Sequence, residues 1–237
     1  MRLGRIDTTA LAVWAGWRLA VLVLGAAFAG LLDAGDGASD WYQRWYQWDA
    51  VHYVGIARAG YEGEPTGVPN EAFLPGLPLL MRAGAALGVT EVAVGVAVSL
   101  VASAVAAVAL ARVAERLVPG TGGWTVLVWL LAPTSVFLAA PYTEALFLAL
   151  ALPAWLAAQD RRWWLAGLLV ALAATVRVSA LFLLVAVLVQ WWVDGRRRLR
   201  DAAWVALAAV PIAVTVVVQH AATGSWFAWW PIASLSS

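Results

Sequence analysis

One short stretch of the chain holds a carboxylate and an imidazole close together. Asp49 and His52 are three residues apart in the run WDAVHY, and residues three apart share one face of a helix. A carboxylate between Trp48 and Ala50 is costly at a lipid boundary unless it has a partner or a chemical task. Asp49 is therefore a candidate functional residue, the alternative being a local salt bridge with Arg44 or His52. His52 taken alone favours a structural role.

Two further charged residues lie where apolar segments end. Tyr142 and Glu144 follow Pro141 at the end of one such segment, and Arg177 lies at the turn between two others. A glutamate in this position either takes part in function or caps the helix that begins there. Arg177 requires an anionic partner. That partner is either Glu144 or the phosphate of a lipid, because the guanidinium fork matches phosphate oxygens.

The elements that must position these residues are strongly apolar. Residues of the set AVILMFWYC make up 63% of the 237 residues and charged residues only 12%, whereas an ordinary globular domain has about a quarter. This composition predicts an all-α polytopic membrane protein. The net charge of +1 gives no argument for a nucleic-acid partner. With no cysteine, the chain has no disulfide framework, thiolate zinc site or thiol nucleophile.

About seven transmembrane helices are predicted from the apolar segments, with no second domain. These segments cover residues 10–32, 92–114, 124–140, 142–158, 163–176, 180–193 and 202–221. Ten of the 15 arginines fall on the side that the N-terminus shares, which predicts a cytoplasmic N-terminus and an extracytoplasmic first loop over 33–90. The segments over 163–193 are short for a full crossing. Their shortness predicts a cavity near Arg177, since irregular backbone at membrane depth must line one.

The first loop is expected to contain an interfacial amphipathic helix over residues 40–60. Asp40 is its predicted N-cap and Gly60 its stop, and Trp41, Trp45, Trp48 and His52 would share one face. Tryptophans on such a face most often anchor a helix at the headgroup level of a membrane. In the following segment, residues 71–82, two prolines are expected to prevent a regular helix start, so that it re-enters the membrane or skims the interface. This segment is also a candidate for one wall of the cavity.

These motifs resemble the PIG-V-like family, which comprises GPI mannosyltransferase II and its bacterial relatives. The resemblance rests on WDAVHY at 48–53, AFLPGLPLL at 72–80, PTS at 133–135, YTE at 142–144 and TVR at 175–177. It implies a GT-C glycosyltransferase fold with a catalytic aspartate in the first extracytoplasmic loop and a lipid-phosphate sugar donor. Residues 1–237 would form a single transmembrane domain of this kind, truncated at the C-terminus relative to the longer relatives.

The resemblance also assigns roles to individual residues. Asp49 takes the position of the catalytic carboxylate and His52 that of its neighbour. The residues assigned to substrate binding are Arg177, Glu144, Tyr142, Trp48 and Tyr53. The expected reaction is an inverting transfer of mannose, or another hexose, from polyprenyl-phosphate-mannose to a hydroxyl of a glycan or glycolipid. It would take place at the extracytoplasmic face of a bacterial plasma membrane.

No cofactor and no metal-ligand set is predicted. The absence of a paired acidic motif beside Asp49 leaves the participation of a divalent cation open. Two other functions stay open at this point. In a transporter or flippase for lipids or solutes, Asp49, Glu144 and Arg177 would line a pathway; inverted repeats would favour it, and none is found. In a non-catalytic truncated membrane subunit of the same family, they would have no reaction to perform, and the short C-terminus favours this alternative.

Overall fold

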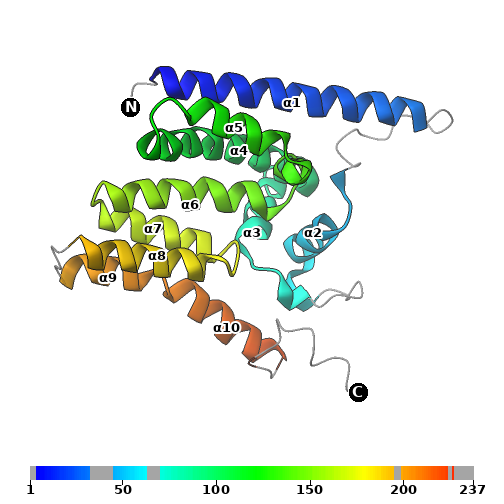
Figure 1. Ribbon diagram of the computed structural model, residues 1–237. Coiled ribbons are helices and arrows are strands. Elements are labelled where there is room, and N and C mark those ends of the chain that lie inside the picture. The colour runs from blue at the N-terminus through cyan, green and yellow to red at the C-terminus, as the bar shows by residue number, and fades with distance from the viewer. Residues whose placement is uncertain (1–3, 33–44, 63–69, 195–198, 224–225, 227–237) are drawn as a thin grey trace.

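The computed structural model describes residues 4–32, 45–62, 70–194, 199–223 and 226, and every regular element in these ranges is helical. Figure 1 shows the helices stacked in a bundle, with α1 along one side. The predicted all-α class is therefore confirmed. The predicted residues Asp40, Trp41 and Arg44 lie outside the described ranges.

Two helices are long and apolar enough to cross a membrane, judged by length and composition. They are α1 (Arg5–Leu32), of which Arg5–Ala27 meets this test, and α4 (Glu91–Leu117). The shorter apolar helices are α5 (Gly122–Leu131), α6 (Thr143–Gln159), α7 (Trp163–Ala174) and α8 (Ala180–Val193). Each of the seven apolar segments thus contains helix, while the seven-span topology stays a prediction.

Two of the predicted segments are broken rather than continuous. The segment over 124–140 divides into α5 and a 3₁₀ helix, η4 (Pro133–Leu138), and that over 202–221 divides into α9 (Leu199–Leu207) and α10 (Val210–Thr223). In both cases a proline lies in the first turn after the break, at Pro133 and Pro211. A proline fits the start of a helix but disrupts its interior, because it lacks an N–H and clashes with the preceding turn.

The centre of the bundle is formed by α4, which packs against α1, α5 and α6, while α6 packs in turn against α7. The buried face of α4 is built from small residues. Its buried alanines include Ala102, Ala106, Ala107 and Ala111. Small side chains let apolar helices approach closely, so that van der Waals contact holds them together where lipid removes the usual hydrophobic driving force. Close contact between small residues therefore helps to hold α4 against its neighbours.

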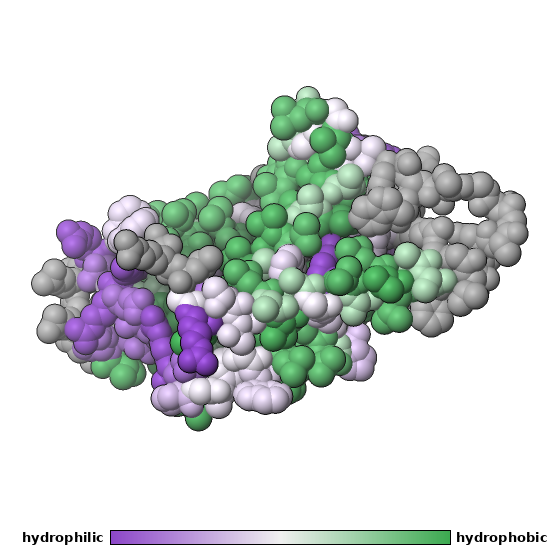
Figure 2. Space-filling view, turned by 90° about the horizontal axis from the view of Figure 1, so that it is seen from above, coloured by the Kyte–Doolittle hydropathy of each residue, from purple (hydrophilic) through white to green (hydrophobic). Residues whose placement is uncertain are grey.

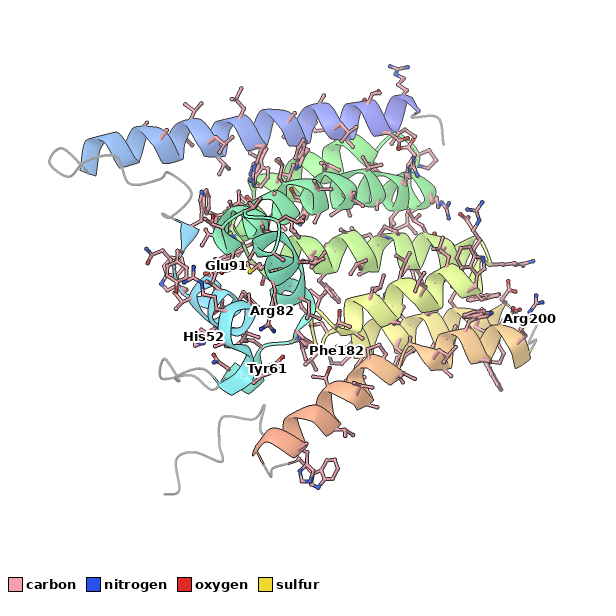
Figure 3. The ribbon with its side chains drawn as sticks, turned by 180° about the vertical axis from the view of Figure 1, so that it is seen from behind. His52, Tyr61, Arg82, Glu91, Phe182 and Arg200 are labelled. Carbon is pink, nitrogen blue, oxygen red and sulfur yellow. The ribbon has the colours of Figure 1, made fainter. Side chains whose placement is uncertain are left out.

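The two ends of α4 are marked by ion pairs to other elements. At one end, Arg112 Nε and Nη2 donate to the two carboxylate oxygens of Asp7, both at 2.7 Å. At the other end, Arg58 Nε and Nη2 donate to the carboxylate of Glu91, both at 2.9 Å. Figure 3 shows Arg200 at the first end, and His52, Tyr61 and Glu91 at the second. Figure 2 shows hydrophobic residues over the middle of the molecule and hydrophilic ones gathered where α1 begins.

The predicted single helix over 40–60 is wrong. Helix α2 (Asp49–Ala59) begins only at Asp49, because Trp48 before it has φ 48° and ψ −124°, outside the helical region. Trp45 packs partly buried in the core, Trp48 is 76% exposed and His52 is buried, so the three do not share one face. Gly60, with φ 73°, ends α2 as predicted and begins the 3₁₀ turn η2 (Gly60–Glu62).

The expectation for residues 71–82 is also wrong. After the 3₁₀ turn η3 (Asn70–Ala72), a regular helix, α3 (Gly76–Ala85), begins directly behind Pro75 and contains Pro78 in its first turn. The first N–H groups of a helix have no acceptor within the helix, so a proline in the first turn, which lacks an N–H, removes no helical hydrogen bond. The segment therefore turns into the bundle, where Leu77 and Met81 are fully buried.

We predict that Gly95 is needed for α4 to pack at the α2 and α3 end of the bundle. A Cβ at this position would lie 2.6 Å from Pro141 Cβ and would also clash with Met81. Gly95→Ala should therefore lower the free energy of unfolding by about 1–3 kcal/mol, measured by thermal or denaturant unfolding in detergent. The matched control is Gly16→Ala on α1, which would meet nothing within 4 Å. Equal stability of the two variants would contradict the prediction.

Candidate functional site

A cavity of about 290 Å³ lies at the end of the bundle that holds α2 and α3. Its walls come from α2, the chain after η3, the start of α6 and the turn between α7 and α8. The lining residues are Asp49, Tyr53, Ala72, Phe73, Leu74, Thr143, Glu144, Val176, Arg177, Val178 and Ser179. The cavity predicted near Arg177 is therefore present. Four of the predicted site residues, from three separate segments, line it together.

Arg177 and Glu144 form an ion pair in this cavity. Arg177 Nη1 donates to Glu144 Oε1 at 2.5 Å and to the hydroxyl of Thr143 at 2.9 Å. Of the two anionic partners considered for Arg177, the structure thus contains Glu144. The second carboxylate oxygen of Glu144, Oε2, is buried without a hydrogen-bond partner among the described residues. Such an oxygen can accept a donor from a bound molecule, because a buried acceptor without a partner is costly.

Thr143 connects this ion pair to α2. It is 2% exposed, and its hydroxyl oxygen lies 3.2 Å from the hydroxyl of Tyr53. Burial raises the pKa of Tyr53 to about 12, so its hydroxyl stays protonated at ordinary pH. Arg177 can only donate and occupies one lone pair of the Thr143 oxygen. Thr143 can then donate to Tyr53, which leaves the Tyr53 proton available to a molecule in the cavity.

Asp49 lines the cavity from the first turn of α2, where the partial positive charge of the helix N-terminus stabilises a carboxylate. Its side chain is exposed and has no hydrogen-bond or ion-pair partner among the described residues. The alternative of a salt bridge with His52 is therefore wrong, and Arg44 lies outside the described residues. The structure leaves this carboxylate accessible from the cavity.

His52 does not line the cavity, although it follows Asp49 by three residues. It is buried, with Nδ1 at 3.1 Å from Oδ1 of Asn70, and its ring stacks on Phe73 at a centroid distance of 4.5 Å. Phe73 in turn contributes to the cavity wall and packs edge-on against Tyr53. His52 thus fixes the chain after η3 rather than facing the space beside Asp49.

Tyr142 and Trp48 also lie outside the cavity lining. The Tyr142 hydroxyl donates to the backbone carbonyl of Gln47 at 3.2 Å, and its ring stacks on Phe137. Tyr142 thereby holds the chain immediately before α2 against the start of α6. The Trp48 side chain points to the exterior, with 76% of its surface exposed.

The segment over 71–82 was expected to form one wall of the cavity, and Ala72, Phe73 and Leu74 line it. No role was predicted for Thr143 or Gly76, although both lie within the motifs YTE and AFLPGLPLL, and their position there was the available signal. The Gly76 N–H donates to the Thr175 carbonyl at 2.8 Å, and a Cβ at Gly76 would lie 2.7 Å from Thr175 Oγ1. This close approach joins the start of α3 to the turn that carries Arg177.

The described residues contain no group of three or more His, Asp or Glu side chains that could hold a metal ion. Asp49 and Glu144 are the two carboxylates that line the cavity.

Comparison with known proteins identifies the family. Residues 22–195 match the family described as Mannosyltransferase (PIG-V). Over 147 residues the chain is 38% identical to GPI alpha-1,6-mannosyltransferase 2 of Mus musculus, covering 57% of this chain and 29% of the mouse protein. It is 34% identical over 146 residues to the protein of that name in Homo sapiens, covering 56% of this chain and 29% of the human protein.

No solved structure matches the chain. The aligned part amounts to less than a third of the length of these curated relatives. The matched segment, however, contains α2, α3 and all the residues that line the cavity. Because the family match extends over well more than half of the sequence and agrees with the motifs, the chain belongs to the PIG-V mannosyltransferase family.

Proposed function

We propose that this chain carries the reaction centre of a membrane mannosyltransferase, which moves mannose from a lipid-phosphate donor to the hydroxyl of a glycan or glycolipid. One observation supports this most directly. A single cavity holds an unpaired carboxylate, Asp49, together with a guanidinium, Arg177, that can receive a phosphate. These two groups suit an inverting transfer from a sugar phosphate, in which a base takes the proton of the acceptor and a positive group stabilises the leaving phosphate.

Asp49 would act as the general base. As the acceptor oxygen attacks the anomeric carbon, its proton passes to the Asp49 carboxylate and a new glycosidic C–O bond forms. The C–O bond to the donor phosphate breaks in the same step, and the phosphate leaves with the bonding electrons. A single displacement of this kind inverts the anomeric centre. Positioned general-base catalysis contributes about 10² to 10⁴ in rate.

Arg177 would stabilise the negative charge that develops on the departing lipid phosphate. Its hydrogen bonds to Thr143 and Glu144 both come from Nη1, which leaves Nε and Nη2 for phosphate oxygens. Glu144 holds the guanidinium in place, and its unpartnered Oε2 would accept a hydrogen bond from a sugar hydroxyl. The Tyr53 hydroxyl would donate a hydrogen bond to the sugar phosphate, since burial keeps the phenol protonated.

The proposed site would lie on the extracytoplasmic side of a bacterial plasma membrane. The arginines on the N-terminal side of the predicted topology would face the cytoplasm, and the cavity lies at the opposite end of the bundle. A polyprenyl tail would stay in the lipid beside the apolar helices while its phosphate enters the cavity. The proposal includes no step through a metal ion. The alternatives, a transporter and a non-catalytic subunit, are outcomes of the assays below.

Removal of the Asp49 carboxylate should abolish transfer. In membranes that contain the chain and a labelled polyprenyl-phosphate-mannose donor, Asp49→Asn should reduce turnover by about 10² or more, because the amide cannot accept the acceptor proton. Expression and unfolding should be unchanged, since Asp49 is exposed and unpaired. Asp160→Asn, at the far end of the bundle beside Arg116, serves as the control. Undiminished turnover in Asp49→Asn would remove Asp49 from the mechanism.

Replacement of Arg177 should mainly weaken use of the donor. We expect Arg177→Ala to raise KM for the lipid-phosphate donor by about tenfold or more, equivalent to about 1.4 kcal/mol, and to lower kcat as well, because the leaving phosphate loses its cation. Arg116→Ala is the matched control, since Arg116 pairs with Asp160 at the opposite end of the bundle and does not line the cavity. An unchanged dependence on donor concentration would contradict the phosphate assignment.

The contribution of Tyr53 should not vary with pH in the neutral range. With a pKa near 12, raised by burial from 10, the phenol remains protonated well above neutrality. Tyr53→Phe should therefore lower kcat/KM for the donor by a constant factor of about ten between about pH 6 and pH 9. A loss that grows or disappears across this range would show that Tyr53 acts as a base rather than as a donor. The measurement is the ratio of kcat/KM values for the two proteins at each pH.

A further inference from the structure

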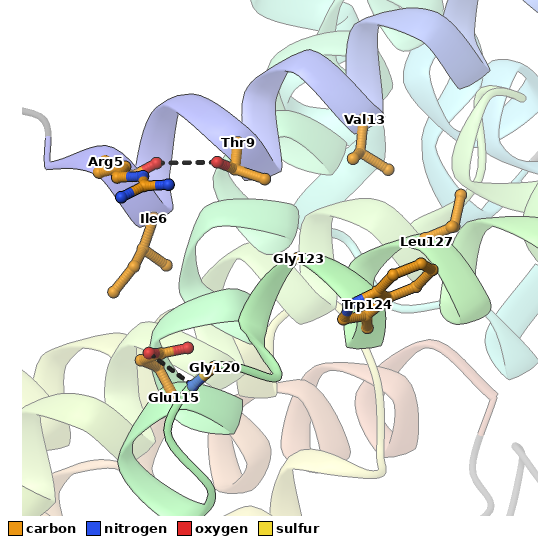
Figure 4. A pocket seen from close by; sticks show the side chains of 9 residues that line it. All are labelled: Arg5, Ile6, Thr9, Val13, Glu115, Gly120, Gly123, Trp124 and Leu127. Atoms are coloured by element: carbon orange, nitrogen blue, oxygen red, sulfur yellow. Dashed lines mark hydrogen bonds between the residues drawn. The ribbon is translucent and has the colours of Figure 1, made fainter.

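A second and larger cavity lies at the opposite end of the bundle from the proposed site. This groove of about 550 Å³ runs between the first turns of α1 and the start of α5 (Figure 4). Its walls include the apolar side chains of Ile6, Val13, Trp124 and Leu127, and its polar side chains include Arg5 and Glu115. None of these residues lines the cavity of Asp49 and Arg177.

Neither charged side chain of the groove forms an ion pair with a described residue. The neighbouring arginines at this end have partners: Arg112 pairs with Asp7, and Arg116 pairs with Asp160. The Arg5 side chain, in contrast, forms no hydrogen bond or ion pair with the described residues, and Figure 4 draws only its carbonyl as an acceptor for Thr9. The groove therefore presents one available guanidinium at the surface.

Glu115 presents the opposite charge and is held in a fixed position. Its Oε1 accepts the N–H of Gly120 at 2.8 Å and its Oε2 accepts the N–H of Gly122 at 3.1 Å. Both donors are neutral, so the negative charge remains, and each carboxylate oxygen can accept a further hydrogen bond. A Cβ on Gly122 would lie 2.8 Å from the Ala111 carbonyl oxygen, which shows how closely α4 and α5 approach beneath this carboxylate.

We propose that this groove binds a zwitterionic aminophospholipid. Its phosphate would contact Arg5, its primary ammonium would donate to Glu115, and one acyl chain would lie along Val13, Trp124 and Leu127. An anionic headgroup without an ammonium would meet the repulsion of Glu115. A choline headgroup has no N–H to donate to the carboxylate and could use only the ring face of Trp124. The lipid would belong to the leaflet opposite the proposed reaction centre, and this site does not rest on the proposed function.

The experiment is native mass spectrometry of the whole chain, released from nanodiscs that contain equal amounts of phosphatidylethanolamine, phosphatidylcholine and phosphatidylglycerol. We expect one phosphatidylethanolamine to remain bound per chain, with a preference of about tenfold over each of the other lipids. In Glu115→Gln this preference should be lost, and binding of phosphatidylglycerol should increase. In Arg5→Gln, retention of all three lipids should decrease by about tenfold.

Arg116→Gln is the control, because Arg116 carries the same charge at the same end of the bundle but does not line the groove. If Glu115→Gln does not fold, Arg5→Gln still tests the proposal. Arg5 is exposed, and only its backbone carbonyl takes part in a hydrogen bond with the described residues, so the replacement breaks no side-chain hydrogen bond. Equal retention of the three lipids by the unaltered chain would overturn the proposal. Lipid retention in Arg5→Gln equal to that of the unaltered chain would also overturn the proposal. A photo-cross-linking residue placed at position 124 that captured protein rather than lipid would overturn it as well.

Discussion

The ion pair between Arg177 and Glu144 is the interaction on which the rest of the site depends. A guanidinium among apolar helices is costly unless a carboxylate and further acceptors meet it; here Glu144 supplies the carboxylate and Thr143 the additional acceptor. These contacts join the turn between α7 and α8 to the start of α6. Through Thr143 and Tyr53 they reach α2, which carries Asp49. The charges that would perform the chemistry are therefore also the charges that hold three separate segments together.

The helical class and the location of the site could be predicted from the sequence because both follow from local composition. Long runs of apolar residues indicate helices however those helices pack together. Charged residues at the ends of such runs are few, so they can be identified directly from the sequence. Glu144 and Arg177 were identified in this way, and Asp49 was identified from its place between Trp48 and Ala50; the structure places all three around one cavity. The residue types at the ends of the apolar segments thus carried enough information to name Glu144 as one of the two possible partners of Arg177.

What could not be predicted depends on single backbone conformations and on contacts between distant segments. The helical period placed His52 beside Asp49, but Asn70 and Phe73 draw the imidazole into the interior. The start of α2 was misjudged because Trp48 adopts a positive φ that no local rule assigns to tryptophan. Pro75 and Pro78 were interpreted as helix breakers, although at the first turn they are compatible with α3. Thr143 acquires its importance only from partners 90 and 34 residues away.

Helix α2 is held by contacts at both of its ends. The Tyr142 hydroxyl holds the chain before its first turn, and Arg58 in its last turn is paired with Glu91 on α4. These two contacts favour a fixed position for the Asp49 carboxylate at the start of the helix. Under the proposed function, the sugar phosphate would have to take the productive pose inside roughly 290 Å³, while its lipid tail would stay outside among the acyl chains. Discrimination between sugars would accordingly be set by fit rather than by closure.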